Sequence, residues 1–215
     1  MLPSSIRAVK DPIYLLPVII DIFRENADHY FFILGARFDE KIYLDMRKII
    51  KDANSDDRII ILDVVEHNDF INILKEVDLV VNSSISEGMS NAIMEAMILG
   101  IPVLARENEG NLTLIKHMNN GLIFSNLMEF RELYLKIFND QELRKIISNN
   151  SINQINEKFS IDFEIEKYIN ILNEFKQKNY IEIKNSNYDT LNLIVSRNEL
   201  PFSVENNEVL NVNIF

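Results

Sequence analysis

The stretch SEGMSNAIMEAMILGIPVLA, residues 86–105, decides how the chain is interpreted. Between Ala92 and Ala105 every residue is apolar, glycine or proline, with the single exception of Glu95. The pattern predicts a buried helix followed by a buried strand, with Glu87 in the turn just before the helix. Because an unpaired buried carboxylate is costly, Glu95 must be protonated, paired with a cation or supplied with hydrogen-bond donors.

Apolar strands and amphipathic helices alternate on both sides of this stretch. The strands are expected at residues 30–37, 58–65, 78–84, 101–105 and 122–125, and the helices at 12–26, 39–53, 69–77, 91–99, 112–117, 127–138, 140–157 and from 162 onward. This alternation predicts an α/β fold with a Rossmann-like, doubly wound parallel sheet. Ligands bind beyond the carboxyl ends of such strands, so the relevant loops are 3–11, 63–68, 83–90 and 106–112.

Three local signals mark where helices are expected to begin. Asp11 is a candidate N-cap with Pro12 at the first helical position, and Pro17 then predicts a kink in that helix. Asn68 is expected to cap the helix at 69–77.

The domain organisation follows from a change in composition near residue 177. Residues 1–176 are expected to form one Rossmann-like domain, with a truncated first strand and a helical C-terminal extension from Asp162. Residues 177–215 are rich in asparagine and have only short apolar patches. They are expected to hold one or two strands or to stay partly disordered.

Composition excludes several classes of function. The chain has 215 residues, no cysteine and a net charge of -11, which exclude disulfides and thiolate metal sites and argue against nucleic-acid binding. No apolar run approaches the ~20 residues that span a bilayer, and the N-terminus lacks the order of a signal peptide. The three histidines show no ligand spacing, so no metal site is expected. These features favour a soluble, cytoplasmic protein.

The start of the helix in the opening stretch is suited to an anion. Ser90 or Asn91 can serve as N-cap, and the free N–H groups of the first turn then form a site for phosphate. Gly88 lets the backbone approach a ligand closely. Glu95 is suited to a vicinal diol such as a ribose, and Glu87 then faces the group attached to the diphosphate. Spacing alone leaves the alternative open that Glu95 points to solvent between helices and that Glu87 is a first-turn acid favoured by the helix dipole.

The same stretch carries a family resemblance. The E-x7-E motif, Glu87 to Glu95, resembles the pattern S-E-G-F-G…E-A-M-A-x-G-x-P-V-x-A of the retaining GT-B glycosyltransferases of group 1. Matching residues are Ser86, Glu87, Gly88, Glu95, Ala96, Met97, Gly100, Pro102, Val103 and Ala105. IRAVKDPIYL and GNLTLIKHMNNGLIFSN are most similar to the glycosyltransferase 1 domain-containing subgroup. The resemblance covers residues 1 to 175, the C-terminal, nucleotide-sugar half of the GT-B fold.

The resemblance implies a metal-independent hexosyltransferase whose substrate is a nucleotide-diphospho-sugar, with no cofactor. It implies that Glu95 holds the donor ribose and that Glu87 contacts hydroxyls of the transferred sugar. The backbone N–H groups of Gly88, Met89 and Ser90 are implied to bind sugar and phosphate. Met89 stands where the family usually has phenylalanine.

The resemblance also implies a cationic clamp on the diphosphate. Lys10 matches the family's diphosphate lysine, whereas the usual arginine position holds Ser5, so Arg7 is the candidate substitute. Glu109-Gly110 replaces a Gly-Gly pair, a change expected to affect sugar choice. A solvated loop pair is the alternative for Arg7 and Lys10.

GT-B enzymes have two Rossmann-like domains, and the resemblance covers only the second. An N-terminal acceptor domain or a partner chain is therefore expected, and the acceptor is unknown. The leading interpretation is the donor-binding half of a retaining glycosyltransferase. The alternative is a non-catalytic nucleotide-sugar-binding or interaction module; a GT-B epimerase is disfavoured by the E-x7-E motif.

Overall fold

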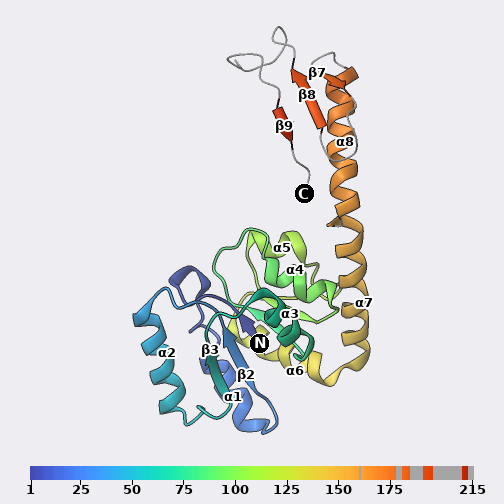
Figure 1. The fold of residues 1–215 in the computed structure, drawn as a ribbon. Helices are drawn as coiled ribbons and strands as arrows, with labels where there is room; N and C mark the ends of the chain where they lie inside the picture. The colour runs from blue at the N-terminus through green and yellow to red at the C-terminus, as the bar shows by residue number, and fades with distance from the viewer. Residues whose placement is uncertain (160, 178–180, 185–190, 196–209, 213–215) are drawn as a thin grey trace. The chain divides into compact units, whose positions relative to one another are not determined.

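The computed structural model describes residues 1–159, 161–177, 181–184, 191–195 and 210–212. The chain divides into two compact units, Met1–Asn156 and Glu157–Phe215 (Figure 1). The boundary expected from composition, between residues 176 and 177, stays a prediction.

The first unit alternates strands and helices along most of its length. Its strands are β1 (Leu2–Pro3), β2 (Phe31–Leu34), β3 (Ile59–Leu62), β4 (Val80–Asn82), β5 (Val103–Arg106) and β6 (Leu122–Phe124). Its helices are the 3-10 turn η1 (Ala8–Lys10), α1 (Leu16–Glu25), α2 (Glu40–Asp52), α3 (His67–Lys75), α4 (Asn91–Ile98), α5 (Glu109–Leu114), α6 (Leu127–Asn139) and α7 (Gln141–Lys158), the last of which runs two residues beyond the unit. Every expected strand and helix of this part is present, which confirms the predicted alternation.

The strands form two parallel three-stranded sheets, β1-β2-β3 and β4-β5-β6, which meet at β1 and β4. The backbone nitrogen of Met1 donates to the carbonyl of Leu79 at 2.6 Å, and the nitrogen of Val81 donates to the carbonyl of Met1 at 2.8 Å. These bonds give the spatial order 3-2-1-4-5-6 of a doubly wound Rossmann-like sheet. The order reverses between β1 and β4, which is where such sheets bind ligands.

The main core packs helices α1, α2, α6 and α7 against one face of the strands. Its largest buried side chains include Phe23, Phe124 and Phe130, all at most 1 % exposed. Side chains alternate along a strand, so Val80 and Val103, which are also fully buried, point to the opposite face. Burial on both faces explains why the strands are continuous apolar runs in the sequence.

The expected start of the first helix is wrong. Asp11 does not cap it: this residue ends η1 with φ 44°, in the left-handed region. Residues 12–15 form turns, and α1 begins only at Leu16. Pro17 therefore occupies the first turn of α1, where its missing N–H costs nothing, and no kink results.

Two other helix starts also lie earlier than expected. Glu66 is the N-cap of α3, so Asn68 lies within the first turn instead of capping it. Helix α5 begins at Glu109, not at residue 112, because the Asn108 side chain accepts a hydrogen bond from the nitrogen of Asn111 and caps the helix.

The second unit holds α8 (Ile161–Gln177) and an antiparallel sheet in the order β7-β8-β9. These strands are Ile181–Lys184, Leu191–Val195 and Leu210–Val212. The described part of the tail thus contains three strands, one more than the sequence suggested, and the remainder of that prediction lies outside the described residues.

Candidate functional site

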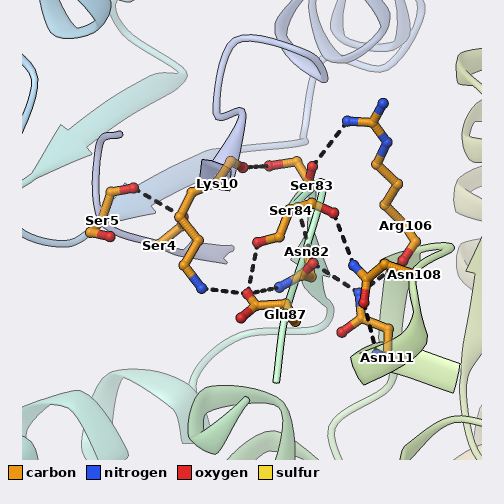
Figure 2. A network of polar contacts seen from close by, with 10 residues as sticks. All are labelled: Ser4, Ser5, Lys10, Asn82, Ser83, Ser84, Glu87, Arg106, Asn108 and Asn111. Carbon is orange, nitrogen blue, oxygen red and sulfur yellow. Dashed lines mark hydrogen bonds and ion pairs between the residues drawn. The ribbon is translucent and has the colours of Figure 1, made fainter. Parts of the chain in front are cut away.

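Three loops meet at the carboxyl ends of β1, β4 and β5 (Figure 2). The Ser83 hydroxyl donates to the carbonyl of Lys10 at 2.8 Å, which joins the first loop to the second. The Asn108 amide donates to the carbonyl of Ser84 at 2.9 Å, which joins the third loop to the second. These are three of the four loops predicted from the sequence, and they lie at the point where the strand order reverses.

Glu87 lies at the centre of this corner and is only 9 % exposed. One of its oxygens, Oε1, accepts hydrogen bonds from the Lys10 ammonium, the Ser84 hydroxyl at 2.7 Å and the Asn82 amide at 3.2 Å (Figure 2). Burial by itself would raise the pKa of Glu87, but the hydrogen bonds and the charge of Lys10 outweigh burial and lower it. Glu87 is therefore a fixed anion. Among the described residues, no hydrogen bond reaches its other oxygen, Oε2.

A chain of buried amides holds the backbone around Glu87. The Asn82 carbonyl oxygen Oδ1 accepts hydrogen bonds from the nitrogen of Ser84 at 3.1 Å and from the amide of Asn111 at 3.0 Å. The same Asn111 amide donates to the carbonyl of Arg106 at 2.8 Å. The two asparagines therefore lock the ends of β4 and β5 to each other, which positions the turn that carries Glu87.

The first turn of α5 approaches the Glu87 turn very closely. A methyl group on Gly110 would lie 2.1 Å from the carbonyl oxygen of Gly88 and 2.3 Å from that of Glu87. Only glycine fits this contact. Behind it, the Oδ1 atom of Asn111 is buried and lacks a hydrogen-bond partner among the described residues.

Arg106, at the end of β5, is a cation of this corner that the sequence analysis did not assign. Its guanidinium donates to the carboxylate of Asp11 at 2.8 Å and to the carbonyl of Ser83 at 3.3 Å. The guanidinium carbon also lies 3.9 Å from the centre of the Tyr14 ring. The side chain is 22 % exposed, so these contacts hold it largely within the protein.

Glu95 lies in the second turn of α4 and is 26 % exposed, so this carboxylate is partly buried. Asn91, four residues before Glu95, and Ile98, three residues after it, lie on the same face of the helix. Both are exposed. Burial raises the pKa of Glu95, and the charge of His67, whose Nδ1 is 3.8 Å from Oε1, opposes that rise. Within the described part of the chain, the Glu95 carboxylate receives no hydrogen bond.

The remaining predicted residues lie at the open edge of the site. Ser90 is the N-cap of α4 by backbone conformation, and its side chain makes no capping hydrogen bond. Met89 is 57 % exposed. Among the described residues, no atom would lie within 4 Å of a methyl group on Gly88. Arg7 directly precedes η1. Its backbone is extended, and the residue is exposed.

The structure therefore brings Lys10 and Glu87 together and leaves Arg7 at the surface. The binding roles implied for these residues stay predictions. Sequence reasoning missed the supporting side chains Asn82, Ser84, Arg106, Asn108 and Asn111. A run of polar residues directly after a buried strand, as in Asn-Ser-Ser at 82–84, was the available signal for the first two.

The described residues contain no group of three or more histidine, aspartate or glutamate side chains that could hold a metal ion. They also contain no helix that is both long and apolar enough to cross a membrane.

Comparison with known proteins identifies relatives of the chain. Residues 3–154 match the family described as "Glycosyl transferases group 1". The chain is 33 % identical over 168 residues to "Glycosyltransferase 1 domain-containing protein 1" of Xenopus tropicalis, an alignment that covers 78 % of this chain. The same alignment covers 48 % of the relative, so the chain spans about half the length of that curated protein.

Two solved structures show the same fold at low sequence identity. One is the C-terminal domain of a group 1 glycosyl transferase, LpcC, from Francisella tularensis, with a TM-score of 0.69, 21 % identity, and coverage of 74 % of this chain and 85 % of that one. The other is Anabaena HepE in complex with UDP-glucose, with a TM-score of 0.71, 20 % identity, and coverage of 80 % and 48 %.

Proposed function

Because the chain belongs to the glycosyl transferases group 1 family, we propose that it is the donor-binding half of a retaining glycosyltransferase. Its fold is that of the C-terminal half of a GT-B enzyme. In this proposal a hexose passes from a nucleotide-diphospho-sugar to an acceptor of unknown identity. The chain spans 48 % of the curated relative, so the activity of the whole protein is part of the proposal.

The diphosphate is proposed to lie between Lys10 and the start of α4. The first turn of an eight-residue helix presents N–H groups and a partial positive charge to the loop before it. Gly88 leaves the backbone open at that end, and the Lys10 ammonium approaches from the first loop. Arg7, exposed in the same loop, is proposed to reach the outer phosphate.

The transferred hexose is proposed to donate a hydroxyl to Oε2 of Glu87. This proposal is carried by a single observation, the convergence of Lys10, Ser84 and Asn82 on Oε1. Three protein donors hold the carboxylate ionised and fixed, so Oε2 is a preorganised acceptor at the switch point of the sheet. Because Oε1 is already occupied, Glu87 is suited to one sugar hydroxyl rather than a bidentate pair.

The donor ribose is proposed to bind Glu95 through its two hydroxyls. Burial has already removed part of the water around this carboxylate, and no protein hydrogen bond has replaced it among the described residues. Hydrogen bonds to a charged acceptor contribute roughly 1.5–3 kcal/mol each. A vicinal diol therefore supplies what this carboxylate lacks.

The proposed chemistry requires no nucleophile from this chain. Holding donor and acceptor in line lowers the entropic cost of reaction, and fixed positive charge stabilises the departing diphosphate. Lys10 is already placed to neutralise that charge, which supports transfer without a metal ion or a cofactor. The cytoplasmic location expected from the sequence stays a prediction.

Calorimetric titration tests the proposal. UDP-, GDP- and ADP-hexoses are titrated separately, starting with UDP-glucose because the Anabaena relative binds it. One of them is expected to bind, and Glu95→Ala is expected to weaken that binding by roughly 2–4 kcal/mol, the scale of lost charged hydrogen bonds. Glu132→Ala is the control, because it removes an exposed carboxylate on α6. No binding of any donor, or equal binding by the Glu95 variant, would overturn the proposal.

A module that binds nucleotide sugars without transferring them is the alternative. Calorimetry does not separate the two, because both bind the donor. Transfer of radiolabelled hexose from the bound donor to an acceptor, measured with the expected acceptor domain or partner chain present, does separate them, because only an enzyme transfers the sugar.

A further inference from the structure

The loop that carries Lys10 adopts a backbone conformation that its sequence does not favour. Asp11 has φ 44° and ψ 53°, the left-handed region that glycine adopts freely and that other residues enter at a cost. It follows Lys10 directly and ends η1, so its conformation sets the path by which the chain leaves Lys10. Something in the surrounding structure must stabilise the conformation.

The Arg106 side chain makes the contacts that can do so. Its guanidinium pairs with the Asp11 carboxylate at 2.8 Å and stacks on Tyr14, three residues further on, at 3.9 Å from the ring centre. It also donates to the carbonyl of Ser83, which anchors it to the neighbouring loop. A planar guanidinium is suited to pairing and stacking at the same time.

The same loop is attached to the β4 loop on its other side. The Ser83 hydroxyl donates to the carbonyl of Lys10, and the nitrogen of Ile85 donates to the carbonyl of Val9 at 3.0 Å. With both sides attached, the Lys10 ammonium reaches Glu87.

We propose that Arg106 is a positioning residue of the donor site, which holds the loop 7–11 in the conformation that directs Lys10 at Glu87. This inference rests on the proposed function. Figure 2 shows the Arg106 guanidinium and the Lys10 ammonium at opposite ends of the polar group, pointing away from each other. Arg106 therefore acts through the Asp11 loop and not by touching the donor.

The first test compares two arginines of similar surroundings. Arg106→Met removes the cation and retains an apolar stem. Arg144→Met is the matched control, because Arg144 also pairs with an aspartate, Asp78 at 3.6 Å, and lies over a ring, Phe138 at 5.1 Å, outside the site. The ligand is whichever of UDP-, GDP- and ADP-glucose the parent chain binds. Arg106→Met is expected to raise the Kd for this ligand roughly tenfold, because that factor corresponds to the free-energy cost of one strained residue. Arg144→Met is expected to leave Kd within about twofold of the parent, since exposed ion pairs contribute little.

The second test is a rescue. Adding Asp11→Gly to Arg106→Met removes the backbone cost, because glycine adopts the left-handed region without strain. The double variant is expected to recover Kd to within about threefold of the parent. Arg106→Lys, which keeps the charge and loses the stacking plane, is expected to fall between parent and Arg106→Met. A double variant as weak as Arg106→Met would overturn the inference, because a direct contact with the donor cannot be rescued at Asp11.

Hydrogen exchange, measured without any donor present, tests this inference separately from the proposed function. The amides of Lys10, Asp11 and Tyr14 all donate within the loop, at 3.0, 3.1 and 3.2 Å, and their hydrogen exchange reports its order. Arg106→Met is expected to accelerate their exchange at least tenfold, and Arg144→Met to leave it unchanged. Unchanged exchange in Arg106→Met overturns the inference whatever the chain binds. A parent chain that binds no donor overturns the proposed function, and with it the donor role given to Arg106.

Discussion

Glu87 and Glu95 are eight residues apart, yet their surroundings shift their pKa values in opposite directions. Glu87 is the more deeply buried of the two and receives three hydrogen bonds from the protein, which lower its pKa despite burial. Glu95 is more exposed and receives none among the described residues, so burial raises its pKa. Burial alone therefore does not decide the state of a carboxylate; the donors around it do.

The contrast indicates two different relations to a ligand. The protein has already supplied the donors of Glu87, so this residue contributes to both the fold and the site. The donors of Glu95 have not been supplied, so this residue contributes little to the fold and is available to a ligand. The contrast makes separate predictions for stability and for binding.

Removing the Glu87 carboxylate is expected to have the largest effect on stability. Glu87→Ala leaves the Lys10 ammonium with no anion and two further donors without their acceptor. Breaking a largely buried pair in this way is expected to lower the free energy of unfolding by about 3 kcal/mol. Urea unfolding followed by circular dichroism measures the change.

Two variants sharpen this measurement. Glu87→Gln keeps an acceptor oxygen for the three donors and is expected to cost only about half as much. Glu95→Ala, which removes a carboxylate without protein donors, is expected to leave the unfolding midpoint nearly unchanged. Equal losses of unfolding free energy in Glu87→Ala and Glu95→Ala would contradict the difference between the two glutamates.

The close turn behind Glu87 is expected to give the next largest effect. Gly110→Ala forces a methyl group against two backbone oxygens of the Glu87 turn, at 2.1 and 2.3 Å, and these have no flexible side chain to move aside. A loss of about 2 kcal/mol is expected, within the range for overpacked sites. Gly88→Ala is the matched control, because a methyl group there meets open space. Differential scanning calorimetry of the two variants measures the loss of stability. If Gly88→Ala destabilised the chain as much, the Glu87 turn would not be held by this contact.

The smallest expected effect is the dependence of donor binding on pH. Since the pKa of Glu95 is raised above its ordinary 4.5, this carboxylate takes up a proton at a higher pH than an ordinary glutamate does. The protonated form accepts hydrogen bonds poorly, so donor affinity is expected to fall a few-fold as the pH is lowered from 7 to 4.5, the ordinary pKa of a glutamate. The stability that Glu87 contributes persists over this range, because its pKa is lowered and that stability is lost only at still lower pH.

Calorimetric titrations at several pH values measure this effect. Glu95→Gln is the control, since it cannot titrate and is expected to bind weakly with no pH dependence from this position. An affinity for the parent chain that stays constant from pH 7 to 4.5 would contradict the assignment of Glu95 to the donor.

The elements of the sheet were predictable because their signals are local. Apolar runs such as FFIL at 31–34 and LIF at 122–124 are buried over most of their length, and the sequence shows that burial as a continuous apolar run. The loop from Lys10 to Leu15 was not predictable in the same way. Asp11-Pro12 has the composition of a helix start, but the left-handed conformation of Asp11 depends on tertiary contacts that no local pattern contains.

The candidate site was predictable only in part, for the same reason. Glu87 and Lys10 were found through their motif, and the structure places them in contact. Arg106 was missed because its partner, Asp11, lies 95 positions earlier in the chain. The two asparagines at 82 and 111 are separated by 29 positions and become meaningful only when β4 and β5 lie side by side.

The seam between β1 and β4 has a consequence for how the protein assembles. Contacts around it join residues 73 to 95 positions apart, so they form only after long loops have closed, and such closures are slow. The corner around Glu87 is therefore expected to be completed late in folding, after local helices have formed. A newly made chain would acquire the corner around Glu87 in one late step, so the formation of this corner would mark the completion of the whole first unit.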